Sequence, residues 1–151
     1  MYFQLTKEQK QFKESVRRLA EERVEPRAKE IDQKGEFPWD IFELFKKQGY
    51  LGLCIPEAYG GQTSEHIYVC LAIEEVARVC VSSSLIIQVQ ALGTFPIMIA
   101  GSEDQKKKYG PLLARGEKVI NFGLTEPEAG SDAGMMRTRA ERRNDRYLLN
   151  G

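Results

Sequence analysis

Residues 122–132 read FGLTEPEAGSD, and the residue types in this segment could bind a charged ligand. A short apolar run leads into a turn rich in Pro, Gly and Ser, where Gly130 allows a ligand to approach the backbone closely. Successive backbone N–H groups in such a turn form a concave nest for an anion, and the hydroxyls of Thr125 and Ser131 can donate or accept hydrogen bonds. The pattern suits a phosphate-bearing cofactor. An ordinary polar turn explains the same residues, so both interpretations stay open at this point.

Two carboxylates, Glu126 and Asp132, also lie in this segment. We expect Asp132 to brace the turn by accepting hydrogen bonds from backbone N–H groups. We expect Glu126 to make a turn or structural contact, and the alternative is that it acts as a catalytic base. We expect no metal site, because the single histidine, His66, has no second His or Cys near it.

The charge balance and the apolar pattern argue against two classes of partner. Twenty-two basic residues balance 22 acidic ones, so a net charge of zero gives no electrostatic argument for binding nucleic acid or an anionic membrane. The longest apolar stretch, residues 85–100, is interrupted by polar residues, Gly and Pro, and is shorter than the roughly 20 residues that a membrane span needs. We therefore expect a buried core helix and no membrane insertion.

The sequence predicts helices over about residues 6–115, and these must position the segment at residues 122–132. Apolar residues recur there at helical spacing. The predicted helices cover about residues 6–35, 38–49, 64–80, 85–100 and 103–115. Capping boxes at Thr6 and Ser102 mark the starts of the first and last helices. Pro26 should bend or interrupt the first helix, and Gly49 should end the second.

Four polar residues fall within the apolar helical patterns. Gln88 and Gln90 lie in an otherwise apolar helix, so each should find a hydrogen-bond partner in the core. We expect Gln88 to face a cavity between helices rather than solvent. We expect Glu74 and Glu75 on a solvated or interdomain face, without a chemical role.

After Gly116 the spacing of apolar residues changes from 3.6 to 2. The predicted strands cover residues 119–124, 136–141 and 146–150, the last two joined by a turn at residues 143–145. Two or three strands are marginal alone. The sequence therefore predicts a mainly α fragment of a longer protein. Its N-terminal α-helical domain covers residues 1–117, and the truncated start of a middle β-domain covers residues 118–151.

Residues 123–132, GLTEPEAGSD, resemble the signature of the acyl-CoA dehydrogenase family. In that signature a small residue, an aliphatic residue, Ser or Thr and Glu are followed two residues later by a small residue, Gly, Ser or Thr and Asp. Other segments resemble the same family in the same order: EFP at 36–38, IPEAYGG at 55–61, AIEEVA at 72–77, QKKKY at 105–109, RTRAE at 137–141 and YLLNG at 147–151. Met135 departs from the pattern, because the family usually has a small residue there. The resemblance spans essentially the whole chain and implies an acyl-CoA dehydrogenase N-terminal-like helical bundle followed by the first strands of a β-barrel domain.

This resemblance implies an FAD-dependent enzyme that dehydrogenates acyl-CoA thioesters between the α and β carbons. It implies that Phe122, Leu124 and Thr125 lie against the flavin ring. It places Gly130 and Ser131 at the FAD pyrophosphate. The catalytic base is expected in a C-terminal domain outside this chain, so we assign no catalytic residue here and expect the fragment alone to be inactive.

The resemblance also implies substrate contacts and partners. Ser131 would lie near the acyl-CoA, and Gln88 falls where the fourth helix of the family closes the acyl-tail pocket. The expected enzyme is of short- or medium-chain type, acts in fatty-acid or amino-acid catabolism, passes electrons to an electron-transfer flavoprotein and forms a homotetramer. Its expected location is the cytoplasm of a bacterium or archaeon, or alternatively the mitochondrial matrix. Two other functions stay open: an acyl-CoA oxidase-like flavoenzyme and a cofactor-free helical interaction module.

Overall fold

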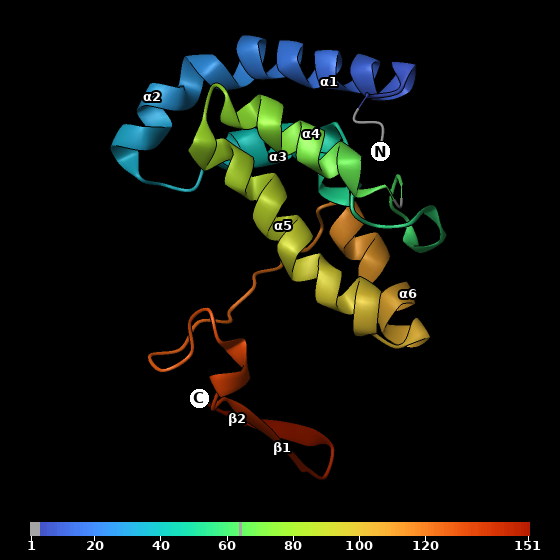
Figure 1. Ribbon diagram of the computed structural model, residues 1–151, viewed down its shortest axis with the longest axis vertical. Coiled ribbons are helices and arrows are strands. Elements are labelled where there is room, and N and C mark those ends of the chain that lie inside the picture. The colour runs from blue at the N-terminus through green and yellow to red at the C-terminus, as the bar shows by residue number, and fades with distance from the viewer. Residues whose placement is uncertain (1–3, 64) are drawn as a thin grey trace. The chain divides into compact units, whose positions relative to one another are not determined.

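The computed structural model describes residues 4–63 and 65–151, which divide into two compact units. The helical unit is Met1–Asn121 and the hairpin unit is Phe122–Gly151. The helical unit contains α1 (Lys7–Leu19), a π-helix (Ala20–Val24), α2 (Glu25–Lys34), α3 (Trp39–Lys47), α4 (His66–Ala77), α5 (Val81–Ala100) and α6 (Glu103–Ala114) (Figure 1). The hairpin unit contains β1 (Arg139–Arg143) and β2 (Arg146–Asn150). The predicted fold class, mainly α with strands at the C-terminal end, is confirmed.

The first predicted helix begins and bends where the sequence indicates. The Thr6 hydroxyl accepts a hydrogen bond from the Gln9 N–H at 3.2 Å, and the Gln9 side chain accepts one from the Thr6 N–H at 3.0 Å, which completes the capping box. Pro26 lacks an N–H and cannot continue the α-helical ladder. The chain passes through the π-helix directly before α2, and α2 turns away from the direction of α1 (Figure 1).

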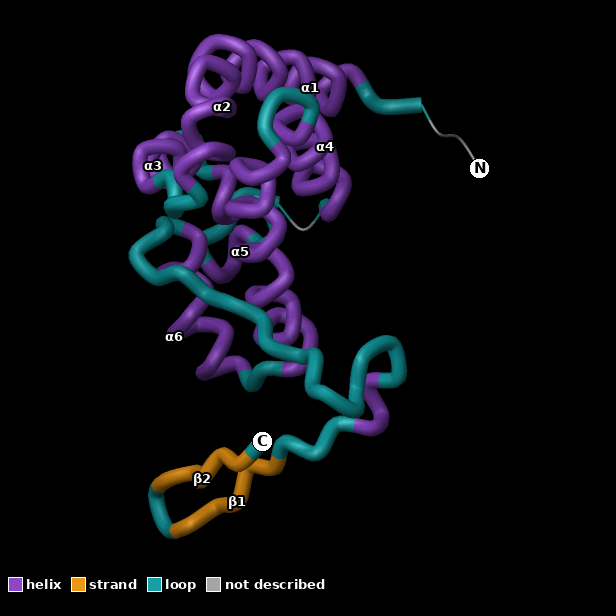
Figure 2. Tube along the Cα trace, turned by 90° about the vertical axis from the view of Figure 1, so that its left-hand side faces the viewer, coloured by secondary structure: helices purple, strands orange, loops and turns teal. Residues whose placement is uncertain are grey.

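Helix α5 runs through the middle of the helical unit, with α1 and α2 towards one end and α6 at the other (Figure 2). The predicted start near residue 85 is wrong, because α5 begins at Val81. The Cys80 thiol accepts a hydrogen bond from the Ser83 N–H at 3.4 Å and caps the start of the helix. Within the described residues, α5 alone is long and apolar enough to cross a membrane, a test that core helices of soluble proteins also pass.

Helices α3, α4 and α5 and the segment after α3 supply much of the core. The residues after Gly49, which ends α3 in a left-handed conformation (φ 74°), form a short 3₁₀ turn and then pack inward. The fully buried side chains there include Leu51, Leu53 and Ile55, which join Phe45 of α3 in the core. Burying each such side chain contributes about 1.5–3 kcal/mol. The predicted start of the third helix at Ser64 lies outside the described residues, and α4 begins at His66.

Gln90 ties three segments of the helical unit together. Its side-chain amide donates hydrogen bonds to the carbonyls of Leu113 and Lys118, both at 3.2 Å, and accepts one from the Ile120 N–H at 3.2 Å. The side chain is buried, so the prediction of a core partner for Gln90 is confirmed. The same contacts overturn the strand predicted over residues 119–124. The Ile120 N–H bonds to a helix side chain, and within residues 4–63 and 65–151 no strand lies beside residues 119–124 to pair with them.

The hairpin unit ends in two antiparallel strands. Arg139 pairs with Asn150 and Arg143 with Arg146, and Asn144 takes a left-handed conformation (φ 54°) in the turn. The second strand is confirmed, and so is a turn before it, although Arg143 belongs to the first strand and the turn itself is residues 144–145. The first strand begins at Arg139 rather than residue 136, because the preceding residues close the loop described below.

Candidate functional site

The predicted flavin residues lie on the surface of the hairpin unit. Phe122 is 40% exposed and Leu124 is 36% exposed, although both are large apolar side chains. Thr125, Gly130 and Ser131 are also exposed. Apolar groups of this size are normally buried, so their exposure beside hydroxyls leaves an amphipathic surface available to a ligand.

Several hydrogen-bond donors of this surface have no partner. Across the described residues, neither the hydroxyls of Thr125 and Ser131 nor the backbone N–H groups of Leu124, Gly130 and Ser131 bond within the chain. A Cβ atom added at Gly130 would meet nothing within 4 Å, so the backbone there is open to a ligand. Unpaired, exposed donors on one short turn are what an anionic group such as a phosphate requires.

Glu126 closes the loop that carries these donors. Its backbone N–H donates to the Ala129 carbonyl at 3.0 Å, and the Ala129 N–H donates to the Glu126 carbonyl at 3.1 Å. Its carboxylate accepts hydrogen bonds from the Arg137 N–H at 2.7 Å, from the Thr138 N–H at 3.0 Å and from the Thr138 hydroxyl. We call these carboxylate contacts the Glu126 clasp.

The clasp confirms a structural contact for Glu126. The hydrogen bond from the Thr138 hydroxyl, followed by those from the backbone N–H groups of Arg137 and Thr138, lowers the pKa of Glu126 below its ordinary value. A carboxylate whose lone pairs are engaged in this way is a poor proton acceptor. Asp132 also behaves as expected: its side chain accepts a hydrogen bond from the Gly134 N–H at 3.2 Å and caps a short 3₁₀ turn.

Gln88, the predicted substrate residue of the helical unit, does not lie where we expected. Its side chain is exposed, does not line the large cavity of this unit and has no hydrogen-bond partner in the described chain. The prediction that it faces a cavity between these helices is therefore wrong. Gln88 instead lies in an exposed stripe of α5 at helical spacing. The large apolar members of that stripe are Val81, Leu85, Leu92 and Ile99.

The cavity that sequence reasoning missed has a volume of about 460 Å³ and opens where α2, α3 and α5 meet residues 119–121. Its walls are mainly apolar and include Phe37, Phe42 and Ile86, and Asp32 and Glu36 also line it. In the described part of the chain, neither carboxylate forms an ion pair. The residues come from four separate segments, so no local pattern in the sequence could have brought them together.

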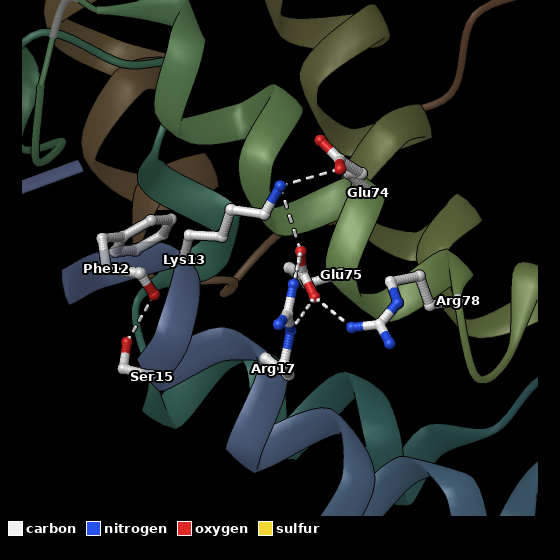
Figure 3. A network of polar contacts seen from close by, with 7 residues as sticks. All are labelled: Phe12, Lys13, Ser15, Arg17, Glu74, Glu75 and Arg78. Carbon is white, nitrogen blue, oxygen red and sulfur yellow. Dashed lines mark hydrogen bonds and ion pairs between the residues drawn. The ribbon is translucent and has the colours of Figure 1, made fainter. Parts of the chain in front are cut away.

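A second feature missed from the sequence is the buried carboxylate of Glu75 (Figure 3). It accepts hydrogen bonds from Arg17 at 2.8 and 3.0 Å and from Arg78 at 2.9 Å, and it lies 3.3 Å from the Lys13 ammonium. The expected solvated face is thus correct for Glu74, which is 58% exposed, and wrong for Glu75, whose side chain is fully buried.

We call these residues the Glu75 cluster: Lys13, Arg17, Glu74, Glu75 and Arg78. The hydrogen bond from Arg17, opposed by burial and reinforced by Arg78 and Lys13, lowers the pKa of Glu75 to about 2. Helical spacing was the signal in the sequence for the burial of Glu75. It follows Leu71 by four residues and Ala72 by three, so it lies on the same buried face of the helix.

Comparison with known proteins decides the family. The family profile described as acyl-CoA dehydrogenase, N-terminal domain, matches residues 6–117. The chain belongs to the acyl-CoA dehydrogenase family. A probable acyl-CoA dehydrogenase of Mycobacterium tuberculosis is 42% identical over 149 residues, covering 99% of this chain and 38% of that protein. A short-chain-specific acyl-CoA dehydrogenase of Clostridium acetobutylicum is 38% identical and is matched over 100% of this chain and 40% of its own length.

Solved structures of the acyl-CoA dehydrogenase family share the fold. The butyryl-CoA dehydrogenase of Megasphaera elsdenii superposes with a TM-score of 0.86 at 34% identity, covering 100% of this chain and 41% of that one. An acyl-CoA dehydrogenase of Bacillus anthracis, solved in complex with FAD, gives a TM-score of 0.84 at 32% identity, covering 97% of this chain and 26% of that one. This chain therefore spans about two fifths of the curated relatives that it matches.

Proposed function

We propose that the full-length protein is an FAD-dependent acyl-CoA dehydrogenase that introduces a double bond between the α and β carbons of an acyl-CoA. The observation that carries this proposal is the set of unpaired donors on residues 124–131, within a chain of this family. A relative of known structure binds FAD, which supports the choice of cofactor. When bound, FAD accepts the hydride, and the protein supplies placement and electrostatics.

The residues of the hairpin unit have distinct proposed roles. Phe122 and Leu124 offer exposed apolar surface to the flavin ring. The Leu124 N–H and the Thr125 hydroxyl are donors for its pyrimidine edge, where donors stabilise negative charge. Gly130 and Ser131 offer an open backbone and a free hydroxyl to the pyrophosphate, and Ser131 is also assigned to the acyl-CoA.

Gln88 keeps a proposed substrate role in spite of its exposure. The α5 stripe around it is apolar and uncovered by the described chain, which suits one wall of an acyl-tail pocket completed by other parts of the protein. The substrate class proposed is a short- or medium-chain acyl-CoA, and a short-chain-specific relative supports it. No described residue is assigned as the catalytic base, which we place outside this chain.

Several properties of the whole protein belong to the same proposal. We assign an electron-transfer flavoprotein as electron acceptor, a homotetrameric assembly and, since the relatives named above are bacterial, the cytoplasm of a bacterium. The domain boundary after residue 117 is also a proposal. The family profile ends at that residue, whereas the compact helical unit continues to Asn121.

The decisive experiment is anaerobic titration of the purified full-length protein with butyryl-CoA and octanoyl-CoA. We expect a yellow protein whose flavin absorbance bleaches on addition of substrate. A colourless protein would indicate a cofactor-free helical interaction module. If the reduced flavin reoxidises rapidly in air rather than needing an electron-transfer flavoprotein, the protein is an acyl-CoA oxidase-like flavoenzyme.

A further inference from the structure

We infer that Glu126 is a positioning residue, which acts through Thr138 and Arg137 to hold the FAD-binding turn in shape. This inference rests on the proposed function, because it concerns how the turn is prepared for that cofactor. The three donors of the Glu126 clasp lie 11 and 12 residues along the chain from their acceptor. The clasp therefore ties the two ends of a loop that contains Gly130 and Ser131.

The loop has few other fixed contacts. Within the described chain, its remaining internal hydrogen bonds join Glu126 to Ala129 and connect neighbours in the short 3₁₀ turn that follows Asp132. These contacts are local and do not bring the two ends together. Without the clasp the loop would gain conformational entropy, and binding of FAD would then have to offset the cost of ordering the loop. The clasp thus makes the unpaired donors available at a constant spacing.

The chemistry of the clasp requires a carboxylate. An ionised carboxylate is an acceptor at both oxygens, and all three of its partners here are donors. An amide at the same position keeps one acceptor oxygen and turns an NH₂ group towards an N–H, so at least one donor loses its partner. Thr125 directly precedes Glu126, so the backbone of a proposed flavin contact is anchored by the same residue.

The charged groups near the clasp supply a matched control. Arg137 donates its backbone N–H to Glu126, while its guanidinium lies 3.9 Å from the carboxylate of Glu128. Glu128 is in the same turn and half exposed, and it makes no other hydrogen bond or ion pair in the described chain. Replacing Glu128 therefore removes the same charge from the same turn without opening the clasp.

The test compares Glu126→Gln, Thr138→Val and Glu128→Gln in the full-length protein. We expect Glu126→Gln to raise the dissociation constant of FAD about tenfold to a hundredfold, as loss of one or two charge-assisted hydrogen bonds predicts. Thr138→Val should give a smaller increase, and Glu128→Gln less than about a twofold one. The visible circular dichroism of bound flavin should change in the first two variants only.

The pH profile separates positioning from a general structural role. The clasp is intact above the ordinary glutamate pKa of 4.5 and is lost as the pH falls through the lowered pKa of Glu126. FAD affinity of the wild type should fall over that acid range more steeply than that of Glu126→Gln. Equal FAD affinity and equal flavin dichroism in Glu126→Gln and Glu128→Gln overturn the inference. If Glu126→Gln does not fold, an unchanged Thr138→Val variant overturns it. A wild-type protein that binds no FAD overturns the proposed function as well.

Discussion

The Glu75 cluster allows a stability prediction with an internal control. Replacing Glu75 with Gln leaves Arg17, Arg78 and Lys13 facing a neutral amide in place of a buried carboxylate. Holding the pKa of Glu75 at about 2 rather than 4.5 corresponds to about 3 kcal/mol, at 1.36 kcal/mol per pKa unit. Arg17 and Arg78 are nearly half exposed and can regain water, so we expect a loss of about 2–3 kcal/mol in the free energy of unfolding.

Glu74→Gln is the matched control, because Glu74 is the neighbouring residue, carries the same charge and pairs with the same lysine at 2.8 Å. Its side chain is 58% exposed, and an exposed pair of this kind contributes at most about 1 kcal/mol. Urea unfolding of the three proteins, followed by far-UV circular dichroism, measures both differences. Equal stabilities of Glu75→Gln and Glu74→Gln would refute the argument that burial makes the Glu75 contacts matter.

The same cluster gives a pH dependence of definite sign. The folded-state pKa of Glu75 lies below its unfolded-state value, so its contribution is fully present above about pH 4.5 and is lost as the pH falls towards 2. Urea unfolding at several pH values should therefore show that the difference in unfolding free energy between the wild type and Glu75→Gln becomes smaller as the pH falls. A gap that stays constant from pH 6 to pH 3 would contradict this account.

Three further predictions concern other parts of the chain. Gln90→Leu should cost about 2–4 kcal/mol in unfolding free energy, because the Ile120 N–H and two carbonyls lose a partner; calorimetry measures the cost. Gln88→Gly in the full-length enzyme should shift substrate preference to longer acyl chains, because each accommodated CH₂ contributes up to about 0.8 kcal/mol. Unchanged kcat/KM ratios across acyl-chain lengths would show that Gln88 does not line the acyl-tail pocket. Residues 1–151 alone should bind FAD weakly and should reduce no dye with butyryl-CoA. The reason is that a few hydrogen bonds of about 0.5–1.5 kcal/mol each do not offset the ~4–15 kcal/mol cost of immobilising a cofactor. Tight stoichiometric binding in a flavin fluorescence titration would contradict this prediction.

Structural features that depend only on residues close together in the sequence could be predicted. The capping boxes at Thr6 and Ser102, the bend near Pro26 and the stop at Gly49 each depend on a few neighbouring residues, and the structure contains all four. The brace formed by Asp132 is of the same kind, since its partner is two residues away.

Features that depend on distant partners could not be predicted in this way. The alternation over residues 119–124 indicates a strand only if a second strand lies beside it, and Gln90 of α5 occupies the Ile120 N–H instead. Glu75 looked solvated because its cations on α1 are 58 and 62 residues away in the sequence. The clasp was missed for the same reason, because the partners of Glu126 follow 11 and 12 residues later.

The π-helix between α1 and α2 sets the rotational phase of the N-terminal segment. Val16, Ala20 and Val24 are fully buried, so the inward-facing line of α1 continues through the five π-helical residues. A π-helix takes one more residue per turn than an α-helix, so the same five residues wound as ordinary α-helix would turn α1 by roughly the 100° of one residue relative to α2. The same rotation would carry Lys13 and Arg17 away from Glu75. An apparent irregularity of the backbone thus keeps two charged residues of α1 directed at a carboxylate on another helix.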